Sequence, residues 1–238
     1  MHFAVGPIIR SSINQTRWMN LGFALAATAL WILILLIKVE FEPAHYQTVD
    51  GTYYQQLAQS FLNGEPMVLK GLANAKGNSF SPYPPGFPFL LALVHHFTGF
   101  SFTISAVLLH GLFLFGMLIL FQNSALGSLL IVAAFSDTGM ELGANCWSEF
   151  SFFALILTFG HFFLQSQSDT KRPDGFLLGI LVMISFLIRY SAVFLAPFLV
   201  WKIVDSGNQK LRNQRVITLI LFGLFFAGWT WWQLFLTG

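Results

Sequence analysis

The sequence predicts an all-α membrane protein, a polytopic transmembrane bundle of about seven helices with interfacial helices in a large first outer loop. Of its 238 residues, 55% are hydrophobic and only 9% are charged, whereas soluble domains carry roughly 25% charged residues. Phe alone accounts for 28 residues, and the mean hydropathy is +0.68. Because each crossing of a bilayer needs about 20 helical residues, residues 1–238 accommodate about seven spans and one sizeable loop, within a single membrane domain.

The charge balance limits the partners. The net charge is only +2, and no basic stripe marks a nucleic-acid surface. We therefore expect no nucleic-acid partner, and instead the lipid bilayer and molecules carried in it. A single cysteine, Cys146, excludes an intrachain disulfide.

The first span is expected at residues 21–37. Arg10 and Arg17 precede it, which predicts a cytoplasmic N-terminus by the positive-inside rule. The apolar run lacks a small-residue cleavage site, so it is interpreted as a retained helix and not as a signal peptide.

Residues 39–100 then form the first outer loop, with two amphipathic helices expected along the membrane surface. The first follows Asp50, where apolar and aromatic side chains recur at helical spacing. The second lies at residues 87–100, which start after Pro84 and Pro85 and are too short to span comfortably.

The remaining spans are tested by charge parity. They are expected at 102–122, 124–138, 147–165, 175–189, 191–204 and 215–236. This count places eight of the 12 basic residues in the cytoplasm and seven of the 10 acidic residues outside, as the positive-inside rule requires. The cytoplasmic basic residues would be Arg10, Arg17, Lys171, Arg172, Lys202, Lys210, Arg212 and Arg215.

Two of these spans depend on parity more than on length. Residues 176–204 form one apolar run interrupted at Arg189, which fits one long tilted helix or two short crossings. The basic loops on both flanks favour two crossings, with Arg189 at the outer turn. The run at 125–136 is also short.

Asp50 is the candidate catalytic residue. It directly precedes the first amphipathic helix, where a partly dehydrated carboxylate could act as a general base toward a hydroxyl. The alternative interpretation is that Asp50 is a solvated residue that caps the helix; from position alone, that interpretation is favoured.

Glu149 and Arg189 are expected at the same outer face. An acidic residue at the mouth of a span can bind a sugar hydroxyl or a metal, but Glu149 could also simply complement the helix dipole. Arg189 should meet a phosphate, a carboxylate or water, or reach ordinary lipid headgroups.

Several strings together resemble one enzyme group. They are Asp50 with Tyr53 and Tyr54, the segment Tyr83 to Leu91 with its Pro-Pro-Gly turn, Ser148-Glu149, the segment from Gly175 to Tyr190, and the ending after Trp229. They resemble the N-terminal membrane half of GT-C-type glycosyltransferases that use polyprenyl-phosphate sugars, such as protein mannosyltransferases and aminoarabinose transferases. Two departures are Gly51 in place of a second acidic residue and Tyr83 in place of a lysine.

The resemblance implies a function and a site. Asp50 would be the catalytic acid or base, and Glu149, Arg189, Tyr53, Tyr54 and Tyr83 would bind the substrate. The donor would be a polyprenyl-phosphate sugar, the acceptor a glycan, lipid or protein, and the cofactor, if one is needed, a divalent cation with unassigned ligands. The short loops and the size favour a bacterial plasma membrane.

Two rival functions remain open. The chain ends at Gly238, where the family usually continues with further helices, so it could be a truncated or non-catalytic membrane subunit that binds lipid or a partner protein. A transporter ranks third, because the spans contain few polar groups at mid-depth that could form a translocation path.

Overall fold

The computed structural model describes residues 7–65, 69–73, 79–80, 83–168, 174–204 and 209–237. Within these residues the chain is helical apart from one pair of short antiparallel strands. The elements are α1 (Pro7–Phe41), α2 (Val49–Leu62), β1 (Leu69–Ala73), β2 (Ser79–Phe80), α3 (Gly86–Thr98), α4 (Phe102–Phe121), α5 (Ala125–Ala134), α6 (Asp137–Ala144), α7 (Glu149–Ser168), α8 (Asp174–Ile188), a 3-10 helix (Tyr190–Leu195), α9 (Ala196–Val204) and α10 (Gln209–Thr237).

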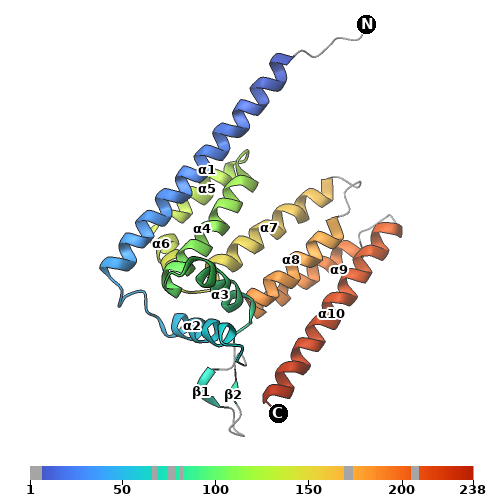
Figure 1. The fold of residues 1–238 in the computed structure, drawn as a ribbon. Coiled ribbons are helices and arrows are strands. Elements are labelled where there is room, and N and C mark those ends of the chain that lie inside the picture. The colour runs from blue at the N-terminus through green and yellow to red at the C-terminus, as the bar shows by residue number, and fades with distance from the viewer. Residues whose placement is uncertain are drawn as a thin grey trace.

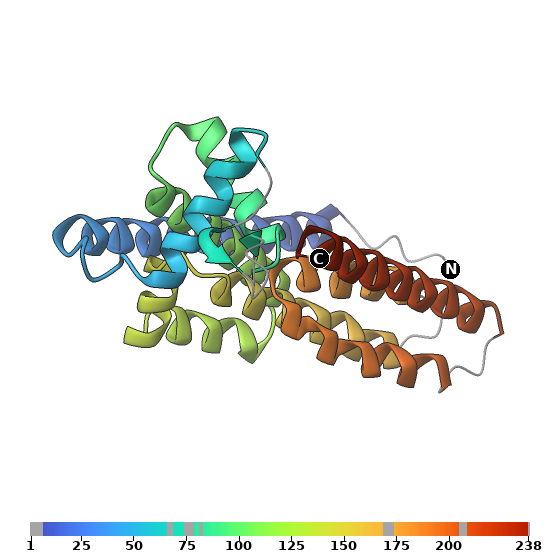
Figure 2. The ribbon, with the colours of Figure 1, turned by 90° about the horizontal axis from the view of Figure 1, so that it is seen from below.

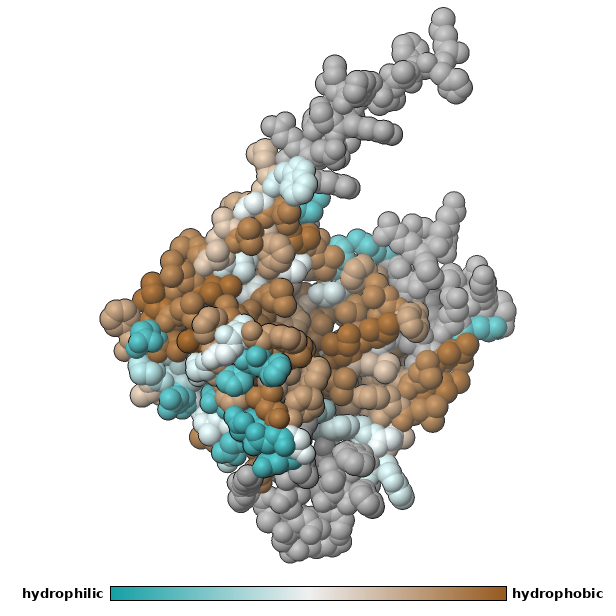
Figure 3. All heavy atoms as spheres, in the orientation of Figure 1, coloured by the Kyte–Doolittle hydropathy of each residue, from teal (hydrophilic) through white to brown (hydrophobic). Residues whose placement is uncertain are grey.

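The long helices run between two ends of a bundle, and α2, α3 and the strands lie across one of them (Figures 1 and 2). We call this the loop end. α1 packs on α4, α7 on α8, and α10 on α8 and α9, while α3 joins α2 to both α4 and α8. Hydrophilic residues gather over α2 and α3 at the loop end, and hydrophobic residues cover the helices above it (Figure 3).

Two helices of the described chain are long and apolar enough to cross a membrane, at Trp18–Phe41 and Phe102–Phe121. The pair α5 and α6 makes a third candidate if it is one span, although it bends by 71°. These helices identify a membrane protein. The other apolar helical stretches in the described ranges are shorter: Gly86–Thr98, Glu149–Gln165, Phe176–Ile188, Tyr190–Trp201 and Leu219–Trp231.

Residues 39–100 contain the two expected helices, together with the β1–β2 strand pair, which the sequence did not predict. One helix, α2, contains Asp50, and a second, α3, starts at Gly86 directly after the proline turn. α3 ends at Gly99, whose φ of 69° is a left-handed conformation that glycine adopts without steric cost. Ser81 and Pro82 of the proline string lie outside the described residues, as do the charged loop residues Lys76, Asp169, Lys171, Arg172 and Asp205.

The apolar run at 176–204 is broken at Arg189, as one of the two interpretations predicted. Arg189 has an extended backbone, with φ −154° and ψ 126°, between α8 and the 3-10 helix. α8 and α9 contact each other, so the chain turns back here. The expected span at 124–138 is instead split, because Ser136 caps a new helix by accepting a hydrogen bond from the Gly139 N–H at 3.1 Å.

Close contact between α3 and α8 brings the proline turn against the Arg189 turn. A Cβ atom at Gly86 would lie 2.6 Å from the carbonyl oxygen of Leu187, closer than nonbonded atoms approach. Glycine at position 86 therefore sets the distance between these two elements.

Candidate functional site

A polar pocket of about 250 Å³ lies at the loop end. Three elements distant in sequence supply its charged side chains: α2, the start of α7, and the turn after α8. Its lining residues are Asp50, Tyr54, Tyr83, Pro84, Glu149, Arg189, Tyr190 and Ser191. The structure thus brings Asp50, Glu149 and Arg189 together around one cavity.

The cap of α2 is Thr48 and not Asp50. The Thr48 hydroxyl oxygen accepts a hydrogen bond from the Gly51 N–H at 3.1 Å, and Asp50 is the second residue of the helix. The interpretation of Asp50 as the cap is therefore wrong. Its carboxylate instead accepts a hydrogen bond from the Tyr83 hydroxyl at 2.5 Å.

Two hydrogen bonds fix α2 against the start of α7. The Trp147 indole N–H donates to the Thr48 hydroxyl at 2.6 Å, and the hydroxyls of Tyr54 and Ser148 lie 2.8 Å apart. Tyr54 and Ser148 are buried. Because Glu149 follows Ser148 directly, these contacts set where its carboxylate lies relative to Asp50.

Arg189 forms an ion pair with Glu149. Of the partners considered for Arg189, the structure shows a carboxylate. The two side chains are 38% and 36% exposed, and ion pairs this exposed contribute only about 0–1 kcal/mol to stability. The pair can therefore open at little cost if a ligand offers Arg189 another anion.

Aromatic side chains form one wall of the pocket. The ring of Tyr83 lies 4.8 Å from that of Tyr54 and 5.8 Å from that of Tyr53, measured between centroids. Tyr53 does not line the pocket, although sequence reasoning placed it in the site; it packs behind Tyr83. The Tyr190 hydroxyl donates to the Tyr83 carbonyl oxygen at 3.4 Å and accepts from the Trp229 indole at 3.1 Å.

The phenols of the site stay protonated over the usual pH range. Burial raises the pKa of Tyr54 to about 12, and Ser148 partly offsets this by hydrogen bonding. Burial also raises the pKa of Tyr83, and its hydrogen bond to the Asp50 carboxylate adds to the effect. Tyr83 is therefore a hydrogen-bond donor toward Asp50.

His110 links α4 to the turn that precedes Glu149. Its two ring nitrogens lie 3.0 Å from the carbonyl oxygens of Gly143 and Trp147, and the side chain is fully buried. His110 is therefore a hydrogen-bonding partner between helices. The neighbouring Cys146 thiol is also buried, which raises its pKa to about 12, so it is no nucleophile.

Sequence reasoning did not assign three of the lining residues to the site: Pro84, Tyr190 and Ser191. Pro84 follows Tyr83 and Tyr190 follows Arg189 in the sequence, so their position next to predicted site residues could have placed them in the site. The acidic residues Asp137 and Glu141, which precede α7 in the sequence, do not line the polar pocket. No group of three or more His, Cys, Asp or Glu side chains that could hold a metal occurs among the described residues.

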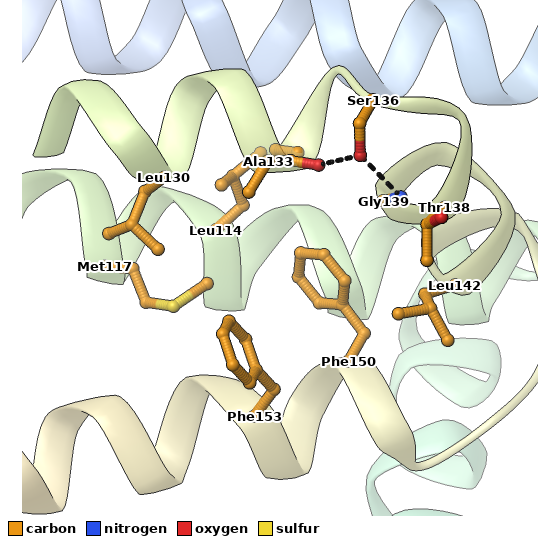
Figure 4. Close-up of a pocket in the computed structure, with 11 residues that line it drawn as sticks. Leu114, Met117, Leu130, Ala133, Ser136, Thr138, Gly139, Leu142, Phe150 and Phe153 are labelled. Atoms are coloured by element: carbon orange, nitrogen blue, oxygen red, sulfur yellow. Dashed lines mark hydrogen bonds between the residues drawn. The ribbon is translucent and has the colours of Figure 1, made fainter. Parts of the chain in front are cut away.

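A second, apolar pocket of about 200 Å³ lies between α4, α5, α6 and α7. Phe150 and Phe153 project into it from α7, and the Ser136 hydroxyl bridges the Ala133 carbonyl and the Gly139 N–H at its edge (Figure 4). Phe150 follows Glu149 in the sequence, so the apolar pocket begins where the polar pocket ends along α7.

No protein-family model, curated protein or solved structure compared with the chain matches it.

Proposed function

We propose that the chain is a glycosyltransferase that moves a sugar from a polyprenyl-phosphate donor to an acceptor hydroxyl at the outer face of a membrane. One observation carries the proposal: two carboxylates and one guanidinium from distant segments line a single pocket at the loop end of an apolar helix bundle. A sugar linked to a lipid tail likewise has a polar part, which suits the pocket, and an apolar part, which suits the helix bundle.

Asp50 is the base in this proposal. A general base must lie within hydrogen-bond reach of the acceptor hydroxyl, and Asp50 is exposed at the pocket. Its carboxylate accepts the hydroxyl proton as the acceptor oxygen bonds to the anomeric carbon. The bond from that carbon to the phosphate oxygen breaks, and the polyprenyl phosphate departs with the electron pair.

Arg189 stabilises the departing phosphate. Guanidinium groups bind phosphate through two parallel hydrogen bonds, and the exposed pair with Glu149 opens at small cost. Glu149 then becomes free to accept hydrogen bonds from sugar hydroxyls. Tyr54 and Tyr83 present aromatic surface and neutral hydroxyls beside the same cavity.

A divalent cation is compatible with this donor set. Mg²⁺ is commonly held by one or two carboxylates together with substrate phosphates, and Glu149 is the residue that would hold it, because Asp50 acts as the base. A bound cation would supply charge stabilisation for the phosphate.

The proposed membrane arrangement has seven spans: α1, α4, α5 with α6, α7, α8, the 3-10 helix with α9, and α10. α2 and α3 lie along the outer surface. This arrangement places the loop end outside and the basic loops in the cytoplasm, as the positive-inside rule requires. We propose a bacterial plasma membrane as the location.

The test is transfer from purified donors. The purified chain is incubated with a panel of polyprenyl-phosphate hexoses and pentoses, and the release of polyprenyl phosphate is measured. We expect Asp50→Asn to lower the rate by at least about a hundredfold, the contribution typical of a general base. Asp137→Asn, the same change outside the pocket, should leave the rate unchanged. Normal transfer by Asp50→Asn would refute the mechanism.

A non-catalytic subunit is the second candidate function. It is favoured by the internal pairing of the pocket, where Asp50 accepts from Tyr83 and Glu149 pairs with Arg189. Such a protein would co-purify with a stoichiometric partner and release no polyprenyl phosphate from any donor in the panel.

A further inference from the structure

A groove lies between α1 and α4, away from the polar pocket. One part, of about 630 Å³, adjoins the ends of both helices at the loop end. A second cavity of about 270 Å³ continues it along the same two helices, and the two share Leu108. We call the two together the α1–α4 groove.

The groove faces the bilayer. α1 and α4 are the two helices that are individually long and apolar enough to cross a membrane. Leu112, on its wall, is 66% exposed, and Leu25 is 61% exposed. A molecule lying against these helices at this depth must therefore come from the lipid phase.

The length of the groove fits one leaflet. Eleven residues separate Ile104, at its polar end, from Phe115, at its far end, which corresponds to about 16 Å of helix. Half of a hydrocarbon core of ~30 Å is about 15 Å. One acyl chain can therefore follow the groove from the headgroup level to the bilayer centre.

Close helix packing forms the floor. A Cβ atom at Gly111 would lie 2.4 Å from Cδ1 of Ile32, so α1 and α4 touch at this point. The side chains on either side of this contact, including Leu108 and Leu112, line the walls of the α1–α4 groove.

The polar end of the groove has two oppositely charged sides. On one side are Glu40, which is exposed, and the C-terminal carbonyls of α1, which ends at Phe41; both favour a cation. On the other side, α4 starts at Phe102 after its cap Ser101, and helix N-termini favour phosphate. No basic side chain is among the groove's lining residues within the described ranges.

We infer that the α1–α4 groove binds one outer-leaflet phospholipid with an ethanolamine head group. The phosphate lies at the start of α4, and one acyl chain follows the α1–α4 groove. The ammonium meets the Glu40 carboxylate, and the side-chain oxygen of Gln47, which lines the same end, is a further acceptor for its N–H groups.

Native mass spectrometry of the purified full chain tests the inference, with phosphatidylethanolamine, phosphatidylcholine and phosphatidylglycerol of equal chain length added in turn. We expect a one-to-one complex that is retained most strongly with phosphatidylethanolamine. Glu40→Gln should weaken that retention about fivefold, as loss of one partly exposed ion pair does. Glu42→Gln, a neighbouring carboxylate outside the groove, should have no effect.

A second variant tests the acyl chain. Leu108→Trp fills the junction of the two cavities and should abolish retention, whereas Leu129→Trp, on the exposed face of α5, should not. Equal retention of phosphatidylcholine or phosphatidylglycerol would overturn the ethanolamine assignment. Retention by Leu108→Trp at the wild-type level, or equal effects of Glu40→Gln and Glu42→Gln, would overturn the site.

Discussion

Tyr54 shows how a single buried side chain connects the two halves of the polar pocket. Its hydroxyl contacts Ser148, 94 residues away in the sequence, and its ring contacts those of Tyr83 and Phe87. Each contact fixes one side of the cavity. A change at Tyr54 should therefore affect the local stability of the whole pocket.

The raised pKa of Tyr54 gives a spectroscopic prediction. Because burial favours the neutral phenol, its contribution to the free energy of unfolding is fully present below the ordinary tyrosine pKa of about 10. That contribution is lost as the pH rises through about 12. In an alkaline titration followed by tyrosinate absorbance, a step near pH 12 should be present in the wild type and smaller in Tyr54→Phe.

Tyr46→Phe is the control for this titration, since Tyr46 does not line the polar pocket. It should leave the step that is assigned to Tyr54. Ionisation of all tyrosines together near pH 10 would contradict the packing described for Tyr54.

Individual site residues could be predicted from the sequence where their own position carries the signal. Asp50 stands at a helix start, Glu149 at the start of an apolar run, and Arg189 interrupts one. The hydrogen bonds of Ser148, Tyr190 and Trp229 could not be predicted in this way, because each joins two residues that are 39 or more positions apart in the sequence.

The packing of α3 against α8 gives a prediction for a whole element. Gly86→Ala would place a Cβ atom 2.6 Å from the Leu187 carbonyl oxygen, so α3 must move away from α8. Overpacking of this kind typically costs about 1–3 kcal/mol. We expect a lower midpoint of thermal unfolding in detergent, together with weaker donor binding, because the Tyr83 turn moves with α3.

Gly116→Ala is the matched control within α4. Apart from the surrounding backbone of α4 and the neighbouring residues in the chain, no heavy atom lies within 4 Å of the Cβ that it would add. Alanine is also the better helix former by about 1 kcal/mol. Its unfolding midpoint should be unchanged or higher. If Gly86→Ala were as stable as Gly116→Ala, the close contact between α3 and α8 would be wrong.

Most helices could be predicted from apolar runs and their interruptions, including the break at Arg189. The bend between α5 and α6 was missed because an apolar run of this length fits a single short span. Ser136 carries the local signal for a new helix start, since its hydroxyl caps α6. The distribution of charged residues predicts how many times the chain crosses the membrane. It contains no information about a bend within a single span.

At the scale of the molecule, the chain separates an apolar body from one polar end. The two helices that are individually long and apolar enough to span a membrane, α1 and α4, carry the α1–α4 groove. The polar pocket lies at the same loop end, among α2, α7 and the Arg189 turn. Both proposals place lipid chains beside the helices and polar head groups at this end. The sidedness of the loop end is therefore the central claim of the account.

Cysteine labelling in intact cells tests that claim most directly. Asp50→Cys and Glu149→Cys are each treated with a membrane-impermeant maleimide, and the native Cys146 serves as the internal control because its thiol is buried. We predict that both introduced cysteines react from outside before the cells are permeabilised, and that the parent chain does not. Reaction of either one only after permeabilisation would place the two carboxylates on opposite or cytoplasmic faces and contradict the account.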